Sequence, residues 1–371
     1  MPKPEKDQSY AMRKLGAAQR ARKQDLTSEP VESLRIGPET TVADLVEQMA
    51  GASIQARNIG LCAKVVERMM ADPTRQTVLL GLAGPLIAAG LRNVIRELVA
   101  SGVVDVVVST GAIIYQDIYQ ARGFRHFQGA IDADDTELRD LYLDRIYDTY
   151  VDEEAFWQTD IWCGKVADAL PRRPMSSRQY LEAVADQLTD DESILATCRR
   201  HGVPVFCPAL NDSSIGIGLT DHRHRAVQKG ETPISIDSIQ DNYELTQIVV
   251  QSPATSAIYV AGGVPKNYIN DSVVMGYIFG LERGHDYAIQ CTTAVTADGG
   301  LSSSTLSEAR SWGKIKKDAN FAMAWVEPSV ALPLIAGYVL QRGCARDRVR
   351  LALEWDGQIL RKIGRAAAAK G

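Results

Sequence analysis

Short apolar runs alternate along the chain with segments of helical periodicity, and most of these runs lack a polar face. Strands that are apolar on both sides are typical of a parallel sheet covered by helices on both faces. The pattern therefore predicts an α/β fold with a doubly wound, mostly parallel sheet. The strands that we expect cover residues 76–83, 103–110, 203–209, 232–237, 257–263, 286–293 and 321–327.

Each expected strand is followed by a turn signal and then by a segment of helical period. Pro85 and Pro265 stand near two expected helix starts, where the fixed φ angle of proline suits the first turn. A third helix, after the last strand, is expected to end at Gly343, a typical C-cap residue. Residues 112–201 are aromatic and acidic, and we interpret them as a helical insertion on the sheet.

The pattern divides the chain of 371 residues into three parts. Residues 1–35 are polar and of mixed charge, as expected of a flexible N-terminal arm. Residues 36–350 are expected to form a single α/β domain that includes the helical insertion. Residues 351–371 are expected to form a C-terminal helix or tail.

Composition removes several classes of function. A net charge of −5 argues against nucleic acid as the main partner. Six cysteines without Cys-x-x-Cys spacing predict neither a metal site nor a disulfide framework, and they indicate a reducing compartment. The first residues lack the apolar core of a signal peptide, and the longest apolar run, residues 78–91, is too short and too broken to span a membrane. We therefore expect a cytoplasmic protein.

Small and polar residues gather where the expected strands end, which is where parallel sheets bind ligands. A G-x-G-x-x-G motif is missing, but small residues let backbone N–H groups approach a phosphate, and carboxylates at such ends can bind ribose hydroxyls. Tight turns and helix caps explain any one of these residues equally well. Together they predict a nucleotide site at Gly84, Thr110, Gly111, Asp212, Gly262, Gly263, Thr293, Ala294 and Glu327.

The segment DGGLSSSTLSEARSWGKIKKD carries the most specific chemistry. Thr305 to Glu308 matches a capping box, and Trp312 would share a helix face with Glu308. Lys314 follows Gly313, where the helix is expected to end or bend. Most lysines are solvated surface charges, but a lysine desolvated beside a tryptophan and a carboxylate can lose its proton and form imines.

The run SEARSWGKI resembles the active-site segment of the deoxyhypusine synthase family, and Lys314 falls on the nucleophilic lysine of that family. The similarity continues through HGVPVFCPALNDSSIG, AGGVPKNYI, GHDYAIQCTTA and VEPSVALPLI, over residues 40–345. The resemblance implies a Rossmann-like fold and a tightly held NAD. It also implies a homotetramer with active sites between paired subunits.

The resemblance further implies a reaction. NAD takes a hydride from the carbon beside the secondary amine of spermidine, and the resulting imine passes an aminobutyl group to the lysine. A second amine then collects the group, and the stored hydride reduces the product. The acceptor is a protein lysine in deoxyhypusine synthases and putrescine in the related homospermidine synthases.

The substrate side departs from the family pattern. Ile217 and Leu301 replace aspartates that pair with the ammonium ends of spermidine, so a fully charged spermidine should bind poorly. Asn267 replaces a histidine, Gln116 a glutamate, and Pro85 an asparagine near the cofactor. The residues that we expect to contact substrate are Glu308, Trp312, Asn267, Asp271 and Gln116.

The strings RGHDY and DGGLS, SEA and SWGKI are similar to those of a bacterial group of deoxyhypusine-synthase-like proteins. Bacteria are not expected to carry hypusine, so a small amine such as putrescine is the favoured acceptor, as in homospermidine synthases. Three alternatives remain open. They are transfer to a protein lysine, action on a less cationic amine in specialised metabolism, and a non-catalytic paralogue that keeps the fold.

Overall fold

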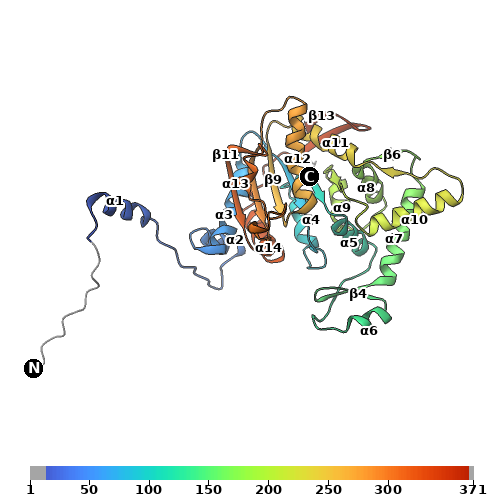
Figure 1. Ribbon diagram of the computed structural model, residues 1–371, viewed down its shortest axis with the longest axis horizontal. Helices are drawn as coiled ribbons and strands as arrows, with labels where there is room; N and C mark the ends of the chain where they lie inside the picture. Colours follow the sequence, from blue (N-terminus) through green and yellow to red (C-terminus); the bar gives the residue numbers. More distant parts are fainter. Residues whose placement is uncertain (1–13, 367–371) are drawn as a thin grey trace, which may run out of the picture.

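The computed structural model describes residues 14–366 (Figure 1). Its centre is a six-stranded sheet in the order β11-β10-β9-β1-β2-β7, and every neighbouring pair of strands is parallel. In order of appearance along the chain, this is the arrangement 6-5-4-1-2-3 of the Rossmann fold, so the predicted fold class is confirmed. The strands are β1 (Thr77–Leu82), β2 (Val106–Ser109), β7 (Val205–Phe206), β9 (Thr255–Val260), β10 (His285–Cys291) and β11 (Ile315–Ala324).

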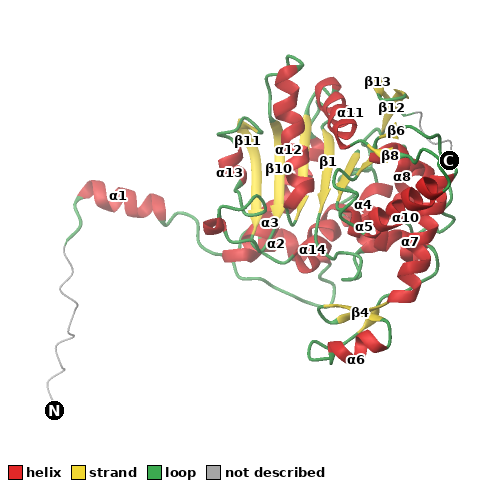
Figure 2. Cartoon of the chain, turned by 45° about the vertical axis from the view of Figure 1, so that its right-hand side comes forward, coloured by secondary structure: helices red, strands yellow, loops and turns green. Residues whose placement is uncertain are grey.

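The central strands are buried on both faces, as their apolar runs predicted. All residues of β1 and β9 are buried, and they pair in register from Thr77 with Thr255 to Leu82 with Val260. Because side chains alternate along a strand, Val78 and Leu80 enter one core while Leu79 enters the other. Figure 2 shows helices in front of and below the strands.

Helices cover both faces of this sheet. One face packs against α3 (Ile54–Ala71), α4 (Arg92–Ala100) and α14 (Pro328–Gln341), with α2 (Val42–Met49) behind α3 and α14. The other face packs against α11 (Ser238–Gln251) and α12 (Gly263–Ile278). Each of these helices places an apolar stripe on the sheet, which is what a doubly wound fold requires.

Two of the three helix boundaries predicted from proline and glycine are confirmed. Pro265 lies in the first turn of α12, and Gly343 follows the C-cap of α14 with a φ of +63°. The third prediction, a helix that opens at Pro85, is wrong. Gly84 and Gly90 both have positive φ angles, so residues 84–91 form a turn and α4 begins only at Arg92.

The insertion is not entirely helical, which corrects the prediction for residues 112–201. A small antiparallel sheet in the order β3-β5-β4 interrupts it, because Tyr147 at φ +58° allows a two-residue turn between alternating segments. The expected strand at 232–237 exists but pairs with β6 outside the main sheet. These elements are α5 (Gly111–Ala121), β3 (Phe127–Gln128), α6 (Asp135–Asp140), β4 (Leu143–Ile146), β5 (Thr149–Asp152), α7 (Glu153–Asp168), β6 (Pro174–Met175), α8 (Ser177–Ala185), α9 (Ile194–Arg200), α10 (Ser214–Gln228) and β8 (Ser235–Ile236).

The two ends differ from each other. Helix α1 (Ala17–Leu26) has no buried residue and lies away from the sheet in Figure 1, and residues 1–13 of the expected arm lie outside the described residues. At the other end, β12 (Leu351–Asp356) and β13 (Ile359–Arg365) form an antiparallel hairpin where we expected a helix or tail. Residues 367–371 lie outside the described residues. The division into arm, domain and tail otherwise stays a prediction.

No helix within residues 14–366 has the length and apolar character needed to cross a membrane.

Candidate active site

The order of the sheet strands reverses between β1 and β9, and two of the predicted glycines flank this point. The N–H of Ala83 donates to the carbonyl of Val260, which ties the two strand ends together. Gly84 (φ +89°) follows β1 and Gly263 (φ +59°) follows β9. A Cβ atom on Gly263 would lie 4.0 Å from that of Ala83. The crevice at such a reversal is where dinucleotides bind in this class of fold.

Close packing of two neighbouring loops explains Gly111. A Cβ atom at Gly111 would stand 2.3 Å from the Oγ atom of Ser213, in the loop that carries Asp212, so only glycine fits. Thr110 is the N-cap residue of α5, and its N–H donates to the carbonyl of Leu82 (3.1 Å). The side chain of Asp212 is exposed at this edge of the sheet.

Gly262 allows the loop at residues 299–304 to lie against the end of β9. A Cβ atom there would come within 2.7 Å of the Cα of Ser302, whose Oγ accepts a hydrogen bond from the N–H of Gly263 (2.9 Å). Gln290 completes the connection by donating to the carbonyls of both Ala261 (2.8 Å) and Ser302 (2.9 Å). Glycine at position 262 therefore brings backbone groups of two loops together.

Thr293, Ala294 and Glu327 follow the last two strands of the sheet. Thr293 is exposed, and the N–H of Ala294 donates to the Oγ1 of Thr292 (3.1 Å). Glu327 caps α14 by accepting from the N–H of Ser329 (2.7 Å), so its capping role is real. The parallel sheet brings all nine predicted cofactor residues to one edge, and these loops offer the close backbone approach that a dinucleotide needs. NAD binding by each of them stays a prediction.

A Schellman motif positions Lys314. Helix α13 (Leu306–Ala309) continues into a turn in which the N–H of Gly313 donates to Arg310 and the N–H of Lys314 donates to Ala309. Gly313 adopts φ +69°, as its place in the motif demands, so the predicted helix end is confirmed. Lys314 directly precedes β11, so it does not belong to the residues that follow strands, where sequence reasoning directed the search.

The helix around Glu308 is shorter than expected, which corrects one prediction. Because α13 ends at Ala309, Trp312 lies in the turn and does not share a helix face with Glu308. The Oγ1 of Thr305 accepts from the N–H of Glu308 (3.0 Å), which is half of the expected capping box. The carboxylate of Glu308 and the indole of Trp312 are both exposed.

The amine of Lys314 reaches the first two turns of α12. Its Nζ lies 3.2 Å from the Oδ1 of Asp271 and 3.5 Å from the Oδ1 of Asn267. The Nδ2 of Asn267 donates to the Oδ2 of Asp271 (2.9 Å), so the three groups form a closed set. The same Nζ stands 5.5 Å from the ring centre of Trp312. The structure thus brings together four of the sequence-predicted residues.

Gln116 is the predicted substrate residue that lies apart from this set. It is buried on α5, and its Oε1 accepts from the N–H of Ala88 (3.1 Å) in the turn after β1. This contact gives Gln116 a part in holding the turn that begins at Gly84. A direct contact with substrate stays a prediction for Gln116, as it does for Glu308, Trp312, Asn267 and Asp271.

Sequence reasoning missed Lys266, which is 1% exposed beside the Lys314 set. Its Nζ donates to the carbonyls of Ser304 (2.6 Å) and Leu301 (3.2 Å). Burial lowers the pKa of Lys266 to about 8, while the carboxylate of Glu308 raises it and the Lys314 ammonium lowers it. A signal was present, because Lys266 continues the buried stripe of α12 at helical spacing from Ile269.

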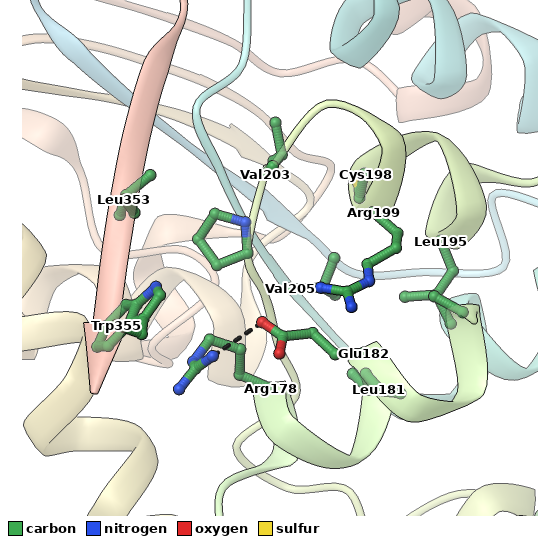
Figure 3. Close-up of a pocket in the computed structure, with 13 residues that line it drawn as sticks. Arg178, Leu181, Glu182, Leu195, Cys198, Arg199, Val203, Val205, Leu353 and Trp355 are labelled. Atoms are coloured by element: carbon green, nitrogen blue, oxygen red, sulfur yellow. Dashed lines mark hydrogen bonds and ion pairs between the residues drawn. The ribbon is translucent and has the colours of Figure 1, made fainter. Parts of the chain in front are cut away.

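A separate cavity of about 300 Å³ lies at the amino end of β7, between α8, α9 and β12 (Figure 3). Arg178 borders it, paired with Glu182 (2.8 Å) and with its guanidinium 4.2 Å from the ring centre of Trp355. None of the predicted site residues lines this cavity. Its position at the opposite end of the strands separates it from the chemistry around Lys314.

Fold and site together define a Rossmann-like α/β enzyme with a lysine at its candidate centre. The family described as deoxyhypusine synthase matches residues 44–339. The chain belongs to this deoxyhypusine synthase family, whose members are NAD-dependent transferases.

Relatives with characterised names support the same assignment. The chain is 41% identical over 322 residues to the "Deoxyhypusine synthase-like protein" of Chlorobaculum parvum, covering 85% of this chain and 90% of the relative. It is 37% identical over 322 residues to "Probable deoxyhypusine synthase 2" of Methanosarcina mazei, covering 85% and 92%. The crystal structure of a putative deoxyhypusine synthase from Entamoeba histolytica has the same fold, with a TM-score of 0.57, 18% identity, and coverage of 84% and 97%.

Proposed function

We propose that this protein is an NAD-dependent transferase that moves an aminobutyl group from a polyamine, through an imine on Lys314, to a small amine such as putrescine. The observation that supports it is the placement of the Lys314 amine. That amine is 15% exposed, is held by a rigid turn, and faces the polar groups of Asn267 and Asp271. A lysine so placed can act as a nucleophile towards an imine carbon once it loses its proton.

Bound NAD supplies the acceptor for the hydride that leaves the carbon beside the donor's secondary nitrogen. Gly84, Gly262 and Gly263 fit such a group, because they flank the strand reversal with room for backbone approach. The Nζ of Lys314 adds to the resulting imine carbon, and the donor's remaining diamine leaves with its proton. The acceptor amine then replaces Lys314 at the same carbon, and the hydride returns to that carbon.

The apolar side chains around the site favour one second candidate. Ile217 and Leu301 stand where carboxylates would pair with ammonium groups, and both are exposed. A less cationic amine therefore suits the same pocket, because it needs fewer buried counter-charges. Transfer to a protein lysine and a non-catalytic role fit these residues less well, since the first needs the lost carboxylates and the second leaves the Lys314 set without a purpose.

We further propose a homotetramer. Several apolar side chains are exposed on the outer face and end of α12 and beside Lys314, and a second subunit would remove them from water. They are Val264, Val274, Tyr277, Ile278, Phe279, Leu301 and Trp312.

The test traps the covalent intermediate. The protein is incubated with NAD and spermidine, homospermidine or putrescine, reduced with borohydride and analysed by peptide mass spectrometry, alongside Lys314→Ala and the control Lys317→Ala. We expect an aminoalkyl adduct on the Lys314 peptide of the wild type and of the control. Absence of an adduct with every amine, in protein shown to bind NAD, would refute the polyamine transferase.

A further inference from the structure

Asp271 stands between an enclosed amine and the open side of the site. Lys314 is 15% exposed, whereas Asp271 is 42% exposed, so the carboxylate remains accessible while it pairs with the lysine. Asn267 lies four residues earlier on the same face of α12 and orients the carboxylate through its 2.9 Å hydrogen bond. An incoming cation would therefore meet Asp271 before it meets Lys314.

Few other charges face this pair. Lys266, on the same helix, and Glu308, on α13, are the remaining side-chain charges that interact here, and Lys266 is already engaged by backbone carbonyls. From β10 the contact is a backbone one, from the N–H of His285 to the carbonyl of Lys314. Ile217 and Leu301 contribute no charge. Asp271 is therefore the carboxylate best placed to receive a substrate ammonium.

The ion pair creates a chemical conflict at Lys314. A carboxylate 3.2 Å away favours the ammonium form of the lysine, whereas a nucleophilic lysine must be neutral. The conflict disappears if the carboxylate changes partner when substrate arrives.

We propose that Asp271 is the ammonium-binding residue of the amine site and that the substrate displaces Lys314 from it. One ammonium of the substrate takes the carboxylate, Lys314 loses its counter-ion, and its proton passes to water. This inference rests on the proposed role of Lys314 as nucleophile. It selects diamines and polyamines over monoamines, because one nitrogen must engage Asp271 while a carbon beside another nitrogen faces Lys314.

Displacement predicts binding changes of opposite sign for the two partners. Putrescine binding is measured by calorimetry on the full chain without added NAD. Lys314→Ala should bind putrescine roughly three- to tenfold more tightly than the wild type, because the competing ammonium is gone. Asp271→Asn should bind it roughly tenfold or more weakly, for want of the counter-charge. The matched control, Asp318→Asn, removes an exposed carboxylate of β11 and should leave binding unchanged.

Proton release gives a second readout. The wild type should release protons on binding putrescine, seen as an enthalpy that depends on the ionisation heat of the buffer, and both variants should lose this release. Weaker or unchanged binding by Lys314→Ala would overturn the inference, as would wild-type affinity in Asp271→Asn.

Failure of this inference can be told apart from failure of the proposed function. A borohydride adduct on Lys314 without the opposite shifts in affinity leaves the transferase intact and removes the exchange at Asp271. The opposite shifts without any adduct leave Asp271 as an amine site and remove the transferase.

Discussion

Replacing Gly313 by alanine should disturb the turn that positions Lys314. Gly313 adopts φ +69°, where an L-residue is strained by about 1–2 kcal/mol. A Cβ atom there would also lie 2.4 Å from the Oη of Tyr277, which donates to the carbonyl of Gly313 (3.2 Å). The tyrosine must move, and its hydrogen bond contributes about 1 kcal/mol. We expect a total loss of about 2–3 kcal/mol in the free energy of unfolding.

Gly230 provides a matched control. It has the same φ of +69°, and an added Cβ atom would meet no other atom within 4 Å. Gly230→Ala should therefore lose only the backbone contribution of about 1–2 kcal/mol. The excess loss in Gly313→Ala, measured by urea denaturation of both variants, isolates the collision with Tyr277.

The same substitution should slow chemistry at Lys314. A shift of about 1 Å in a reacting group can reduce a rate on the order of 10²-fold, so the borohydride-trapped adduct should form far more slowly in Gly313→Ala. The rate in Gly230→Ala should match the wild type. Adding Tyr277→Ala to Gly313→Ala removes the collision and should recover the excess loss of stability. Equal unfolding free energies for Gly313→Ala and Gly230→Ala would refute this reasoning.

Two further substitutions test a buried carboxyl and a cofactor contact. Burial raises the pKa of Asp241 from 3.8 to about 7, so its ionisation destabilises the fold increasingly between those two pH values. The free energy of unfolding of the wild type should therefore fall relative to Asp241→Asn, by up to about 4 kcal/mol, between pH 4 and pH 7.5, and a pH-independent difference in urea denaturation would contradict this. Glu327→Gln keeps an oxygen for the N–H of Ser329 but loses the charge, so NAD affinity should fall about tenfold while the melting temperature changes little. Unchanged NAD affinity, measured by calorimetry, would leave Glu327 as a helix cap alone.

Several features of the site were readable in the sequence because they depend on local chemistry. Gly313 before Lys314 indicated a helix end, since only glycine adopts positive φ without strain, and the structure shows that end. Proline and glycine likewise marked the ends of α12 and α14. The same local rule failed at Pro85, because two positive-φ glycines beyond it favour a turn over a helix.

Other errors came from segments whose pairing depends on distant residues. The acidic stretch that contains Tyr147 has the composition of a helix, but a strand forms where a partner strand is available, and composition does not reveal the partner. The C-terminal hairpin formed by β12 and β13 was missed for the same reason.

By itself, the sequence determined the doubly wound sheet, since uninterrupted apolar runs can be buried only between two layers of helices. It also determined the family, through motifs that recur in order along the chain. Tertiary structure alone decided which groups meet Lys314. Asn267 and Asp271 share a helix face by their spacing, but only the packing of α12 beside β10 and β11 brings that face to the lysine. The burial of Lys266 had the same origin, because a lysine loses its solvent only when another segment covers it.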